Sequence, residues 1–509
     1  MAPPPLRLAV AAAAAISVLV PATASASPQP ARSSAAFVDS IGVNIHSSFG
    51  NTPYDDHARV LATLKDLGVR NVRDGLFTPT GAPSVVTRQK QFRANLANAG
   101  IRSELIMGSP GENAAAYVNS IKDEGTRVIS GIEGPNEWDN SGRANWASEV
   151  RTYQQQLYTA AKAQPGLSGV PVLGPSLAYN DRADTLGNVG AWTDQANLHL
   201  YPGGRAPGTF DDGLSSLAQK VSGGEPAVIT ETGYHNAMYQ PGGHAPTSEA
   251  ATATYTQRMF LDNFRRGIPR TFAYELINTF NDPVKMSANY NFGLLRNDWS
   301  PKPVYGALKN LIALTDPQTA DTAAGALEYS LSGNSGVQQV LLRRNDGAFA
   351  LVLWQTAPVW DAYGRREIGV APKTVKVSLA APADVSTGRP QAGTGLTAVA
   401  NGATSASVSV PGGDALVVVI RPTGAPAPPP ADGGVTDKAP TTPVTPAPTP
   451  PAPAPTAKPT LQQQWQQALA NLKRRLGLRT AEKQAAAKKA KARAKAKAKA
   501  KSKKRSKAR

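Results

Sequence analysis

The fold of this chain is decided by two short stretches, Ile132-Glu133-Gly134-Pro135-Asn136-Glu137-Trp138 and Val228-Ile229-Thr230-Glu231-Thr232-Gly233-Tyr234-His235. Each stretch opens with apolar, β-branched residues and leads to a glutamate beside small or turn-forming residues. β-branched runs favour strands, and neighbouring glycine or proline marks the point where a strand ends. We therefore expect Glu137 and Glu231 to lie at the carboxyl ends of two strands.

Eight strand-like runs alternate with helix-like segments between Phe37 and Leu314, over about 280 residues. Strands and helices that alternate in this way form right-handed βαβ units around a parallel sheet, and eight such units fit a (β/α)8 TIM barrel. The strand-like runs are Ile41–Ile45, Val69–Arg73, Ile101–Met107, Val128–Ile132, Val170–Gly174, Ala196–Leu200, Ala227–Thr230 and Thr271–Leu276. The helix-like segments include His57–Leu67, Val86–Ala99, Asn113–Glu124, Ala144–Ala163 and Ser248–Arg266.

An open, doubly wound α/β sheet is the competing fold. Such a sheet usually carries a Gly-rich phosphate loop after its first strand. Here the first strand runs into Asn44-Ile45-His46-Ser47-Ser48, which contains no glycine. The sequence therefore favours a barrel over residues 37–314.

The pattern of hydrophobic residues changes after the predicted barrel. Residues 316–422 hold short, often alternating runs and turn signals, which predict an all-β sandwich packed against the barrel. Residues 423–460 are rich in Pro, Ala and Thr and predict a semi-rigid linker. Residues 461–478 have apolar side chains at helical spacing, so they form either an amphipathic helix for a partner or membrane surface, or a marginal linker helix.

The first 26 residues have the pattern of a secretory signal. Arg7 precedes an apolar run, Leu8–Val20, and Ala24-Ser25-Ala26 is a small-residue cleavage site. Because the run is short for a bilayer span, we expect cleavage after Ala26 and a secreted protein, with an uncleaved anchor as the alternative. The absence of cysteine excludes disulfides, zinc–thiolate sites and cysteine nucleophiles.

The net charge of +18 belongs almost entirely to one end of the chain. From Leu461 to Arg509 there are 18 Lys and Arg residues and one acid, Glu482, which gives that segment a charge of +17. Residues 479–509 form an Ala/Lys/Arg tail that we expect to be disordered when unbound, because it has nothing to bury. A dense cationic tail binds polyanions through counterion release.

Glu137 follows the fourth predicted strand, and Glu231 ends the seventh. In a parallel barrel both positions lie on the rim that carries active sites. Cleavage of a glycosidic bond needs one protonated carboxyl as acid and one ionised carboxyl as nucleophile, about 5–5.5 Å apart when the anomeric configuration is retained. The other interpretation is that both glutamates are helix N-cap or rim charges.

Asn136-Glu137 after strand four and Thr230-Glu231 after strand seven resemble the signature of glycoside hydrolase clan A, the retaining 4/7 barrels. The segment Phe292–Tyr305 is similar to the loop before the last barrel helix of many clan members. The resemblance covers residues 37–314, and a following β-sandwich recurs in several families of the clan. It implies that Glu137 is the acid/base, that Glu231 is the nucleophile, and that the Asn136 amide donates to the sugar 2-hydroxyl.

Further candidates lie on the same rim. Arg73 follows strand two, where its charge would keep the nucleophile ionised, or it pairs with an acid such as Asp74. His199 and Tyr201 resemble the His-x-Tyr of the clan, whose tyrosine contacts the nucleophile; a buried histidine without a catalytic role is the alternative for His199. The remaining candidates for substrate contact are His46, Trp138, Tyr234 and Glu275, any of which could instead serve packing or loop anchoring.

The five histidines form no metal-ligand motif, so we expect no metal and no cofactor. The expected partners are a carbohydrate substrate and, through residues 479–509, an anionic cell-envelope polymer. The tail has no interleaved aromatic residues, which argues against specific nucleic-acid recognition, and we expect a monomer. The rival interpretations are a catalytically silent glycan-binding barrel anchored by its tail, and a scaffold whose function lies in the tail.

Overall fold

The computed structural model describes residues 27–208, 211–315 and 324–423, all of which belong to one compact unit. The predicted signal (residues 1–26), linker, amphipathic helix and basic tail lie outside the described residues. In the described part of the chain, no helix combines the length and apolarity needed to cross a bilayer.

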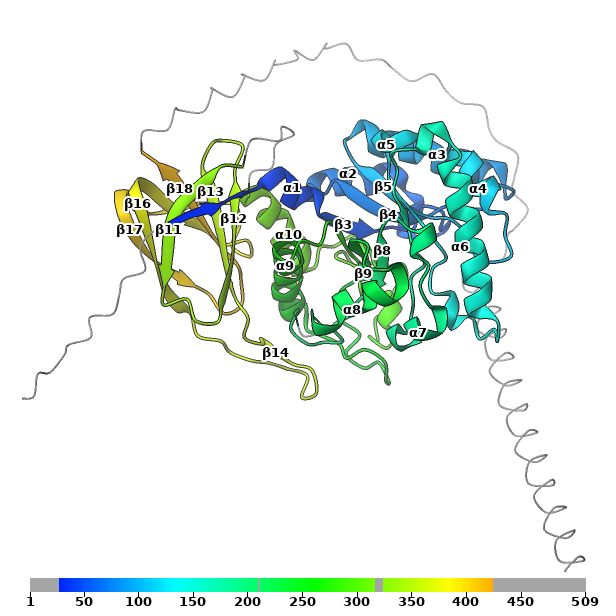
Figure 1. Cartoon of the computed structure of the whole chain (residues 1–509). Helices are drawn as coiled ribbons and strands as arrows, with labels where there is room; N and C mark the ends of the chain where they lie inside the picture. The colour runs from blue at the N-terminus through cyan, green and yellow to red at the C-terminus, as the bar shows by residue number, and fades with distance from the viewer. Residues whose placement is uncertain (1–26, 209–210, 316–323, 424–509) are drawn as a thin grey trace, which may run out of the picture. The chain divides into compact units, whose positions relative to one another are not determined.

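Eight parallel strands form a barrel with the order β7-β6-β5-β4-β3-β10-β9-β8. Figure 1 labels β3, β4, β5, β8 and β9 of this barrel. A parallel bridge between Leu173 and Gln195 joins the two ends of this order and closes the ring. Each strand overlaps one of the eight predicted runs, so the predicted barrel is confirmed. The strands are β3 (Ile41–Asn44), β4 (Asn71–Gly75), β5 (Arg102–Ile106), β6 (Ile129–Glu133), β7 (Val172–Leu173), β8 (Ala196–His199), β9 (Ala227–Thr232) and β10 (Thr271–Ala273).

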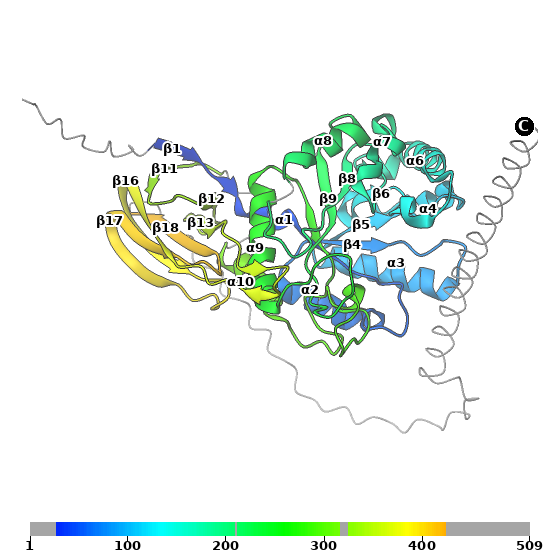
Figure 2. The ribbon, with the colours of Figure 1, turned by 90° about the horizontal axis from the view of Figure 1, so that it is seen from below.

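Helices surround the barrel strands (Figure 2). Their apolar residues recur at helical spacing, so these residues form one face of the helix, which packs against the sheet. For example, α2 (His57–Leu67) starts where the Asp56 side chain accepts from the Arg59 N–H, and it ends at Gly68, whose φ of 85° suits glycine. The others are α1 (Ser34–Asp39), α3 (Pro83–Asn98), α4 (Ala114–Ile121), α5 (Gly125–Val128), α6 (Trp146–Lys162), α7 (Ala183–Leu186), α8 (Asp211–Ser222), α9 (Glu249–Arg265) and α10 (Pro303–Leu314).

The all-β domain after the barrel is also confirmed, although its strands form one large mixed sheet and a separate two-stranded sheet of β14 and β15. The long strands β16 and β17 pair along their length, and different halves of β16 pair with β11 and β18. The apolar faces of these strands bury one shared core. The strands are β11 (Ala326–Ser332), β12 (Val337–Arg343), β13 (Phe349–Gln355), β14 (Trp360–Asp361), β15 (Arg366–Glu367), β16 (Lys373–Gly388), β17 (Thr397–Val410) and β18 (Leu416–Pro422).

Two short strands at the N-terminal end of the described chain join this sheet, which the sequence did not predict. Strand β1 (Ser27–Pro30) pairs with β11, and β2 (Arg32–Ser33) pairs with β12. Figure 2 shows the blue β1 beside β11. The segment is short, polar and contains proline, so its extended form depends on sheet edges supplied by residues about 300 positions away.

Helix α9 connects the barrel to the β domain. Its Arg258 guanidinium donates to the carbonyl oxygen of Ala357 (2.7 Å) and to that of Gly412. The Tyr255 hydroxyl accepts the N–H groups of Val359 (3.0 Å) and Trp360 (3.1 Å). Because α9 has the barrel on one side and the β domain on the other, most of its residues are buried.

Candidate active site

The two predicted glutamates lie on the rim at the carboxyl ends of the strands. Glu231 is the fifth residue of β9, and Glu137 follows β6 after the turn that Gly134 and Pro135 begin. Glu137 has a left-handed backbone, with φ 48° and ψ 34°, and its N–H donates to the carbonyl oxygen of Ser176. Non-glycine residues in this conformation cluster at functional sites.

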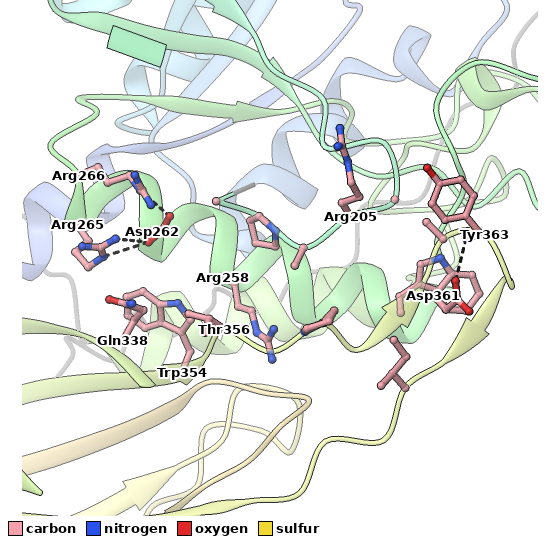
Figure 3. A pocket seen from close by; sticks show the side chains of 18 residues that line it. Arg205, Arg258, Asp262, Arg265, Arg266, Gln338, Trp354, Thr356, Asp361 and Tyr363 are labelled. Carbon is pink, nitrogen blue, oxygen red and sulfur yellow. Dashed lines mark hydrogen bonds and ion pairs between the residues drawn. The ribbon is translucent and has the colours of Figure 1, made fainter. Parts of the chain in front are cut away.

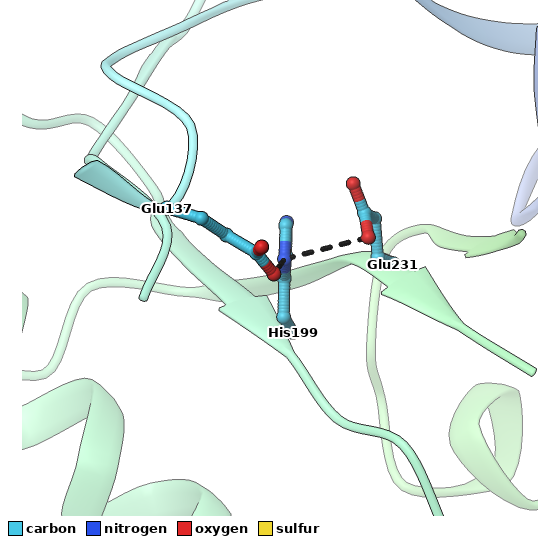
Figure 4. Close-up of side chains that lie close together, drawn as sticks. All are labelled: Glu137, His199 and Glu231. Carbon is cyan, nitrogen blue, oxygen red and sulfur yellow. Dashed lines mark hydrogen bonds and ion pairs between the residues drawn. The ribbon is translucent and has the colours of Figure 1, made fainter. Parts of the chain in front are cut away.

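Glu137, His199 and Glu231 meet at one point of the rim (Figure 4). Nδ1 of His199 lies 2.7 Å from Oε1 of Glu137 and 3.6 Å from Oε2 of Glu231. One oxygen of each carboxylate and this ring nitrogen all lie within 4.8 Å of one another. The two carboxylates are therefore close enough to act on one anomeric carbon, at a separation that suits retention rather than inversion.

The Arg73 guanidinium connects the nucleophile candidate to the barrel interior. Its NH1 donates to Oε1 of Glu231 (2.5 Å) and to Oδ1 of Asn44 (3.0 Å). Its NH2 donates to Oδ1 of Asn136 (2.6 Å), and Glu133 accepts from Nε (2.6 Å) and NH2 (2.9 Å). The predicted cation beside the nucleophile is thus present, and the bidentate contact with Glu133 fixes its orientation.

Charged and polar neighbours hold Glu231 in its ionised form. Burial alone would raise the pKa of this carboxyl, but the charges of His199 and Arg73 and the hydrogen bonds from Tyr201 and Arg73 lower the pKa to about 2. The Tyr201 hydroxyl donates to Oε2 of Glu231 at 2.7 Å. Burial and the Glu231 charge raise the pKa of Tyr201 well above its ordinary value, so this hydroxyl keeps its proton and donates.

These groups line a pocket of about 1160 Å³ at the centre of the rim. The predicted residues that line it are His46, Arg73, Asn136, Glu137, His199, Tyr201 and Glu231. Asn136 uses its side-chain oxygen to accept from Arg73, which leaves its NH2 group as the donor toward the pocket. These lining residues come from the ends of five different strands, β3, β4, β6, β8 and β9, which the barrel topology brings together on one rim.

Three predicted substrate contacts do not line the pocket. Tyr234 is buried in the core against Tyr255, at 5.4 Å between ring centroids. Trp138 packs on a neighbouring apolar cluster and donates from its indole to Glu149 (2.9 Å). The prediction of direct contact by these two is wrong, because the chain turns their side chains into packing positions.

Glu275 also lies behind the pocket wall. It is fully buried, accepts from the hydroxyls of Tyr54 (3.1 Å) and Thr279 (2.9 Å), and lies 3.2 Å from Nε2 of His46. Its place in the pocket is taken by Tyr274, which lines the wall. Tyr274 and Glu275 directly follow the end of β10, and the sequence did not determine which of the two faces the substrate.

Other lining residues come from loops and were missed by the sequence interpretation. The main ones are Tyr179, Asn180, Arg205, Gln240, His244, Tyr274, Met286 and Phe292. Gln240 and His244 lie on the loop between β9 and α9. No local pattern marks these loop residues as part of the site, because loop conformation depends on tertiary contacts.

The spacing of Glu137, His199 and Glu231 would also allow a cation to bind. However, the Arg73 guanidinium already neutralises Glu231, and Tyr201 occupies the other oxygen of that carboxylate. These contacts favour a nucleophile kept ionised by the protein itself.

A second cavity, of about 580 Å³, lies where α9 meets the β domain (Figure 3). Arg258, Trp354 and Tyr363 line it, with the ion-paired Asp262 and Arg265 at one side. It contains no pair of facing carboxylates available for chemistry, so the rim pocket is the candidate active site.

No protein-family model and no curated protein sequence matches this chain. Solved structures do match it. A monomeric β-xylosidase from Caulobacter crescentus CB15 aligns at 14% identity and a TM-score of 0.53, over 78% of this chain and 98% of that one. A glucosidase from Croceicoccus marinus aligns at 12% identity and a TM-score of 0.54, over 77% of this chain and 97% of that one.

A family 39 glycoside hydrolase from the gut symbiont Bacteroides cellulosilyticus WH2 aligns at 15% identity and a TM-score of 0.52, over 75% of this chain and 81% of that one. At these identities the comparison concerns the fold. The resemblance to clan A is thereby confirmed at the level of architecture: the chain has the fold of the clan A glycoside hydrolases, a TIM barrel followed by a β domain.

Proposed function

We propose that this chain is a secreted retaining O-glycoside hydrolase. The single observation that carries the proposal is the approach of Glu137 and Glu231, whose carboxylate oxygens lie within 4.8 Å of each other on a rim that also supplies Arg73 and Tyr201. Two carboxylates at this separation are suited to double displacement. The glycosidase fold of the matching structures supports the same activity.

In the first step the ionised Glu231 attacks the anomeric carbon while Glu137 gives its proton to the leaving oxygen. In the second step Glu137 takes a proton from water, and the resulting hydroxide displaces Glu231 from the sugar. Arg73 and Tyr201 stabilise the Glu231 carboxylate before attack and after its release. His199 contacts Glu137 through Nδ1, which orients the acid toward the leaving oxygen.

The test uses the full chain without its first 26 residues and a panel of 4-nitrophenyl glycosides. The wild type should release nitrophenol from at least one sugar, and Glu231→Ala should lose this activity. Azide should restore turnover in Glu231→Ala and give a glycosyl azide of inverted configuration, because azide replaces the missing nucleophile. Unchanged activity in both Glu231→Ala and Glu137→Ala would reject the mechanism and favour the silent glycan-binding barrel.

We further propose that the basic tail keeps the secreted enzyme at the cell envelope. Residues 461–509 carry a charge of +17, and the anionic polymers accessible to an exported protein are wall and surface polyanions. A chain that ends at Thr460 should lose low-salt binding to teichoic acid and keep its turnover. If the shortened chain binds as well as the whole one, the tail has no such role.

A further inference from the structure

Among the described residues of the barrel, the large hydrophobic side chains that are exposed all lie on one face. Ten large hydrophobic side chains are exposed among the described residues, and six of them belong to the barrel. All six lie on loops that follow strands β3, β7, β9 or β10, and so surround the mouth of the active-site pocket. They are Phe49, Tyr179, Tyr239, Phe280, Val284 and Met286. Apolar surface gathered in this way around a polar pocket marks a binding surface.

Two of these residues are aromatic rings backed by a neighbouring side chain. The Phe49 ring stacks on the ring of His46, a pocket residue, with 4.7 Å between centroids and 13° between planes. The Tyr179 ring lines the pocket and has the Arg182 guanidinium over it, 4.4 Å from its centroid. The two residues are 45% and 47% exposed. Each ring is therefore held in place from one side and remains accessible to a ligand.

The strand order places these two rings on opposite sides of the mouth. Phe49 follows β3 and Tyr179 follows β7, which are four strands apart in a closed ring of eight. A line from one to the other leaves β4, β5 and β6 on one side and β8, β9 and β10 on the other. Glu137 follows β6 and Glu231 lies on β9, so the two carboxylates lie on either side of this line.

We infer that the site takes a polysaccharide chain across the whole mouth, with sugar rings stacked on Phe49 at one end and on Tyr179 at the other. A chain along this line passes between the acid and the nucleophile and has sugar units bound on both sides of the bond that is cleaved. This arrangement gives internal cleavage of the polymer. The inference rests on the proposed function for the cleavage, but the binding of the chain does not depend on catalysis.

Binding is tested first, without turnover. Glu231→Gln is run by affinity electrophoresis in gels that contain arabinoxylan, mixed-linkage β-glucan, glucomannan or polygalacturonate. At least one polymer should retard it, and adding Phe49→Ala or Tyr179→Ala should weaken this retardation about tenfold in apparent Kd, the loss expected for one stacked ring. Tyr179→Phe keeps the ring and should bind like the parent. Tyr363→Ala, a fully exposed ring in the β domain, is the matched control and should not change binding.

Hydrolysis then separates this inference from the proposed function. In the otherwise wild-type chain, Phe49→Ala and Tyr179→Ala should each lower kcat/KM on the retarding polymer about tenfold, mainly through KM, and should lower kcat/KM on the 4-nitrophenyl monoglycoside much less. The wild type should lower the viscosity of the polymer before many reducing ends appear. Retardation without hydrolysis of the polymer or of any 4-nitrophenyl glycoside would leave the inferred binding of the chain standing and would reject the proposed function together with internal cleavage.

Three results would overturn the inference while the proposed function survives. The first is hydrolysis of a monoglycoside by a chain that none of the four polymers retards. The second is an equal loss of monoglycoside and polymer hydrolysis in the alanine variants. The third is the release of monosaccharide alone from one end of the polymer.

Discussion

The Arg73 guanidinium donates to Oε1 of Glu231 at 2.5 Å, from a side chain that is 2% exposed. Arg73 lies on β4 and Glu231 on β9, 158 positions later in the sequence. Barrel closure brings the two together, and this contact helps to keep the nucleophile ionised against the effect of its own burial. The proposed attack on the anomeric carbon depends on this pair, because Glu231 must be ionised to act as the nucleophile.

Replacing Arg73 by glutamine should therefore alter the pH dependence of catalysis. Without the cation, the pKa of Glu231 rises from about 2, so a smaller fraction of the nucleophile is ionised in acid. We expect kcat/KM to fall ~100-fold at pH 6 and still further at pH 4, with the acid limb of the pH–rate profile moved to higher pH. Arg143→Gln, at an exposed pair outside the pocket, is the control and should leave the profile unchanged. If the acid limb of the pH–rate profile does not move in Arg73→Gln, Arg73 does not control the ionisation of Glu231.

The Tyr201 hydroxyl offers a second test, with a matched control in the same chain. Tyr201→Phe removes the 2.7 Å hydrogen bond to Glu231 and should lower kcat/KM about 10- to 100-fold, with a small rise in the pKa of the nucleophile. Tyr234→Phe removes a buried hydroxyl that has no hydrogen-bond partner among the described residues, three positions after Glu231, and should leave the kinetics unchanged. Equal effects of the two substitutions would mean that the loss in Tyr201→Phe is structural.

Glu137→Ala should separate the two steps of the reaction. Substrates with a good leaving group need little help from an acid, so glycosylation by 2,4-dinitrophenyl glycosides should persist while the hydrolysis of the covalent intermediate slows. A burst of dinitrophenol followed by a slow steady state is the expected trace in stopped-flow kinetics. Azide should speed the slow phase and give a product of retained configuration. A uniform loss for good and poor leaving groups would contradict an acid/base role.

Arg258 should be important for stability, because it joins the barrel to the β domain. Arg258→Met leaves the carbonyl oxygens of Ala357 and Gly412 without these donors in a buried place, and we expect a loss of about 2–4 kcal/mol in the free energy of unfolding. Urea titration followed by circular dichroism measures this loss. Arg366→Ala removes an exposed ion pair with Asp361 and should cost less than ~1 kcal/mol. If Arg258→Met and Arg366→Ala have similar urea midpoints, Arg258 does not stabilise the junction between the barrel and the β domain.

Lys302 gives a prediction for stability in alkali. It is 1% exposed and donates to Asn236 (3.0 Å), Asn278 (3.3 Å) and the carbonyl of Asn291 (2.8 Å). Burial, together with the nearby cations, lowers its pKa to about 7. Between this pH and the ordinary lysine pKa the unfolded chain binds one more proton than the folded chain. The free energy of unfolding should therefore rise by about 1.4 kcal/mol per pH unit from this group.

The Lys302→Met variant should lack this slope. Urea unfolding at pH 7, 8 and 9 measures the free energy of unfolding of the wild type and of the variant. The wild-type value minus the variant value should increase with pH. Lys309→Met, at an exposed position, serves as the control. A difference that stays constant with pH would show that Lys302 has the same pKa in the folded and unfolded chains.

The sequence alone determined the barrel, the all-β domain and the rim positions of Glu137 and Glu231. Alternation of β-branched runs and amphipathic helices is a local property, and in a parallel barrel it places every strand end on one rim. The short spacing between a strand and the glutamate after it was thus enough to bring two distant carboxylates to the same site.

Only the tertiary structure decided which neighbours face the pocket. Tyr274 lines it while Glu275 lies behind it, and Tyr234 is buried although it follows Glu231 by three residues. The directions of side chains at strand ends and in loops depend on contacts with residues far away in the sequence, such as those between Lys302 and three asparagines. The local sequence pattern does not predict such contacts, because they form only when the barrel closes.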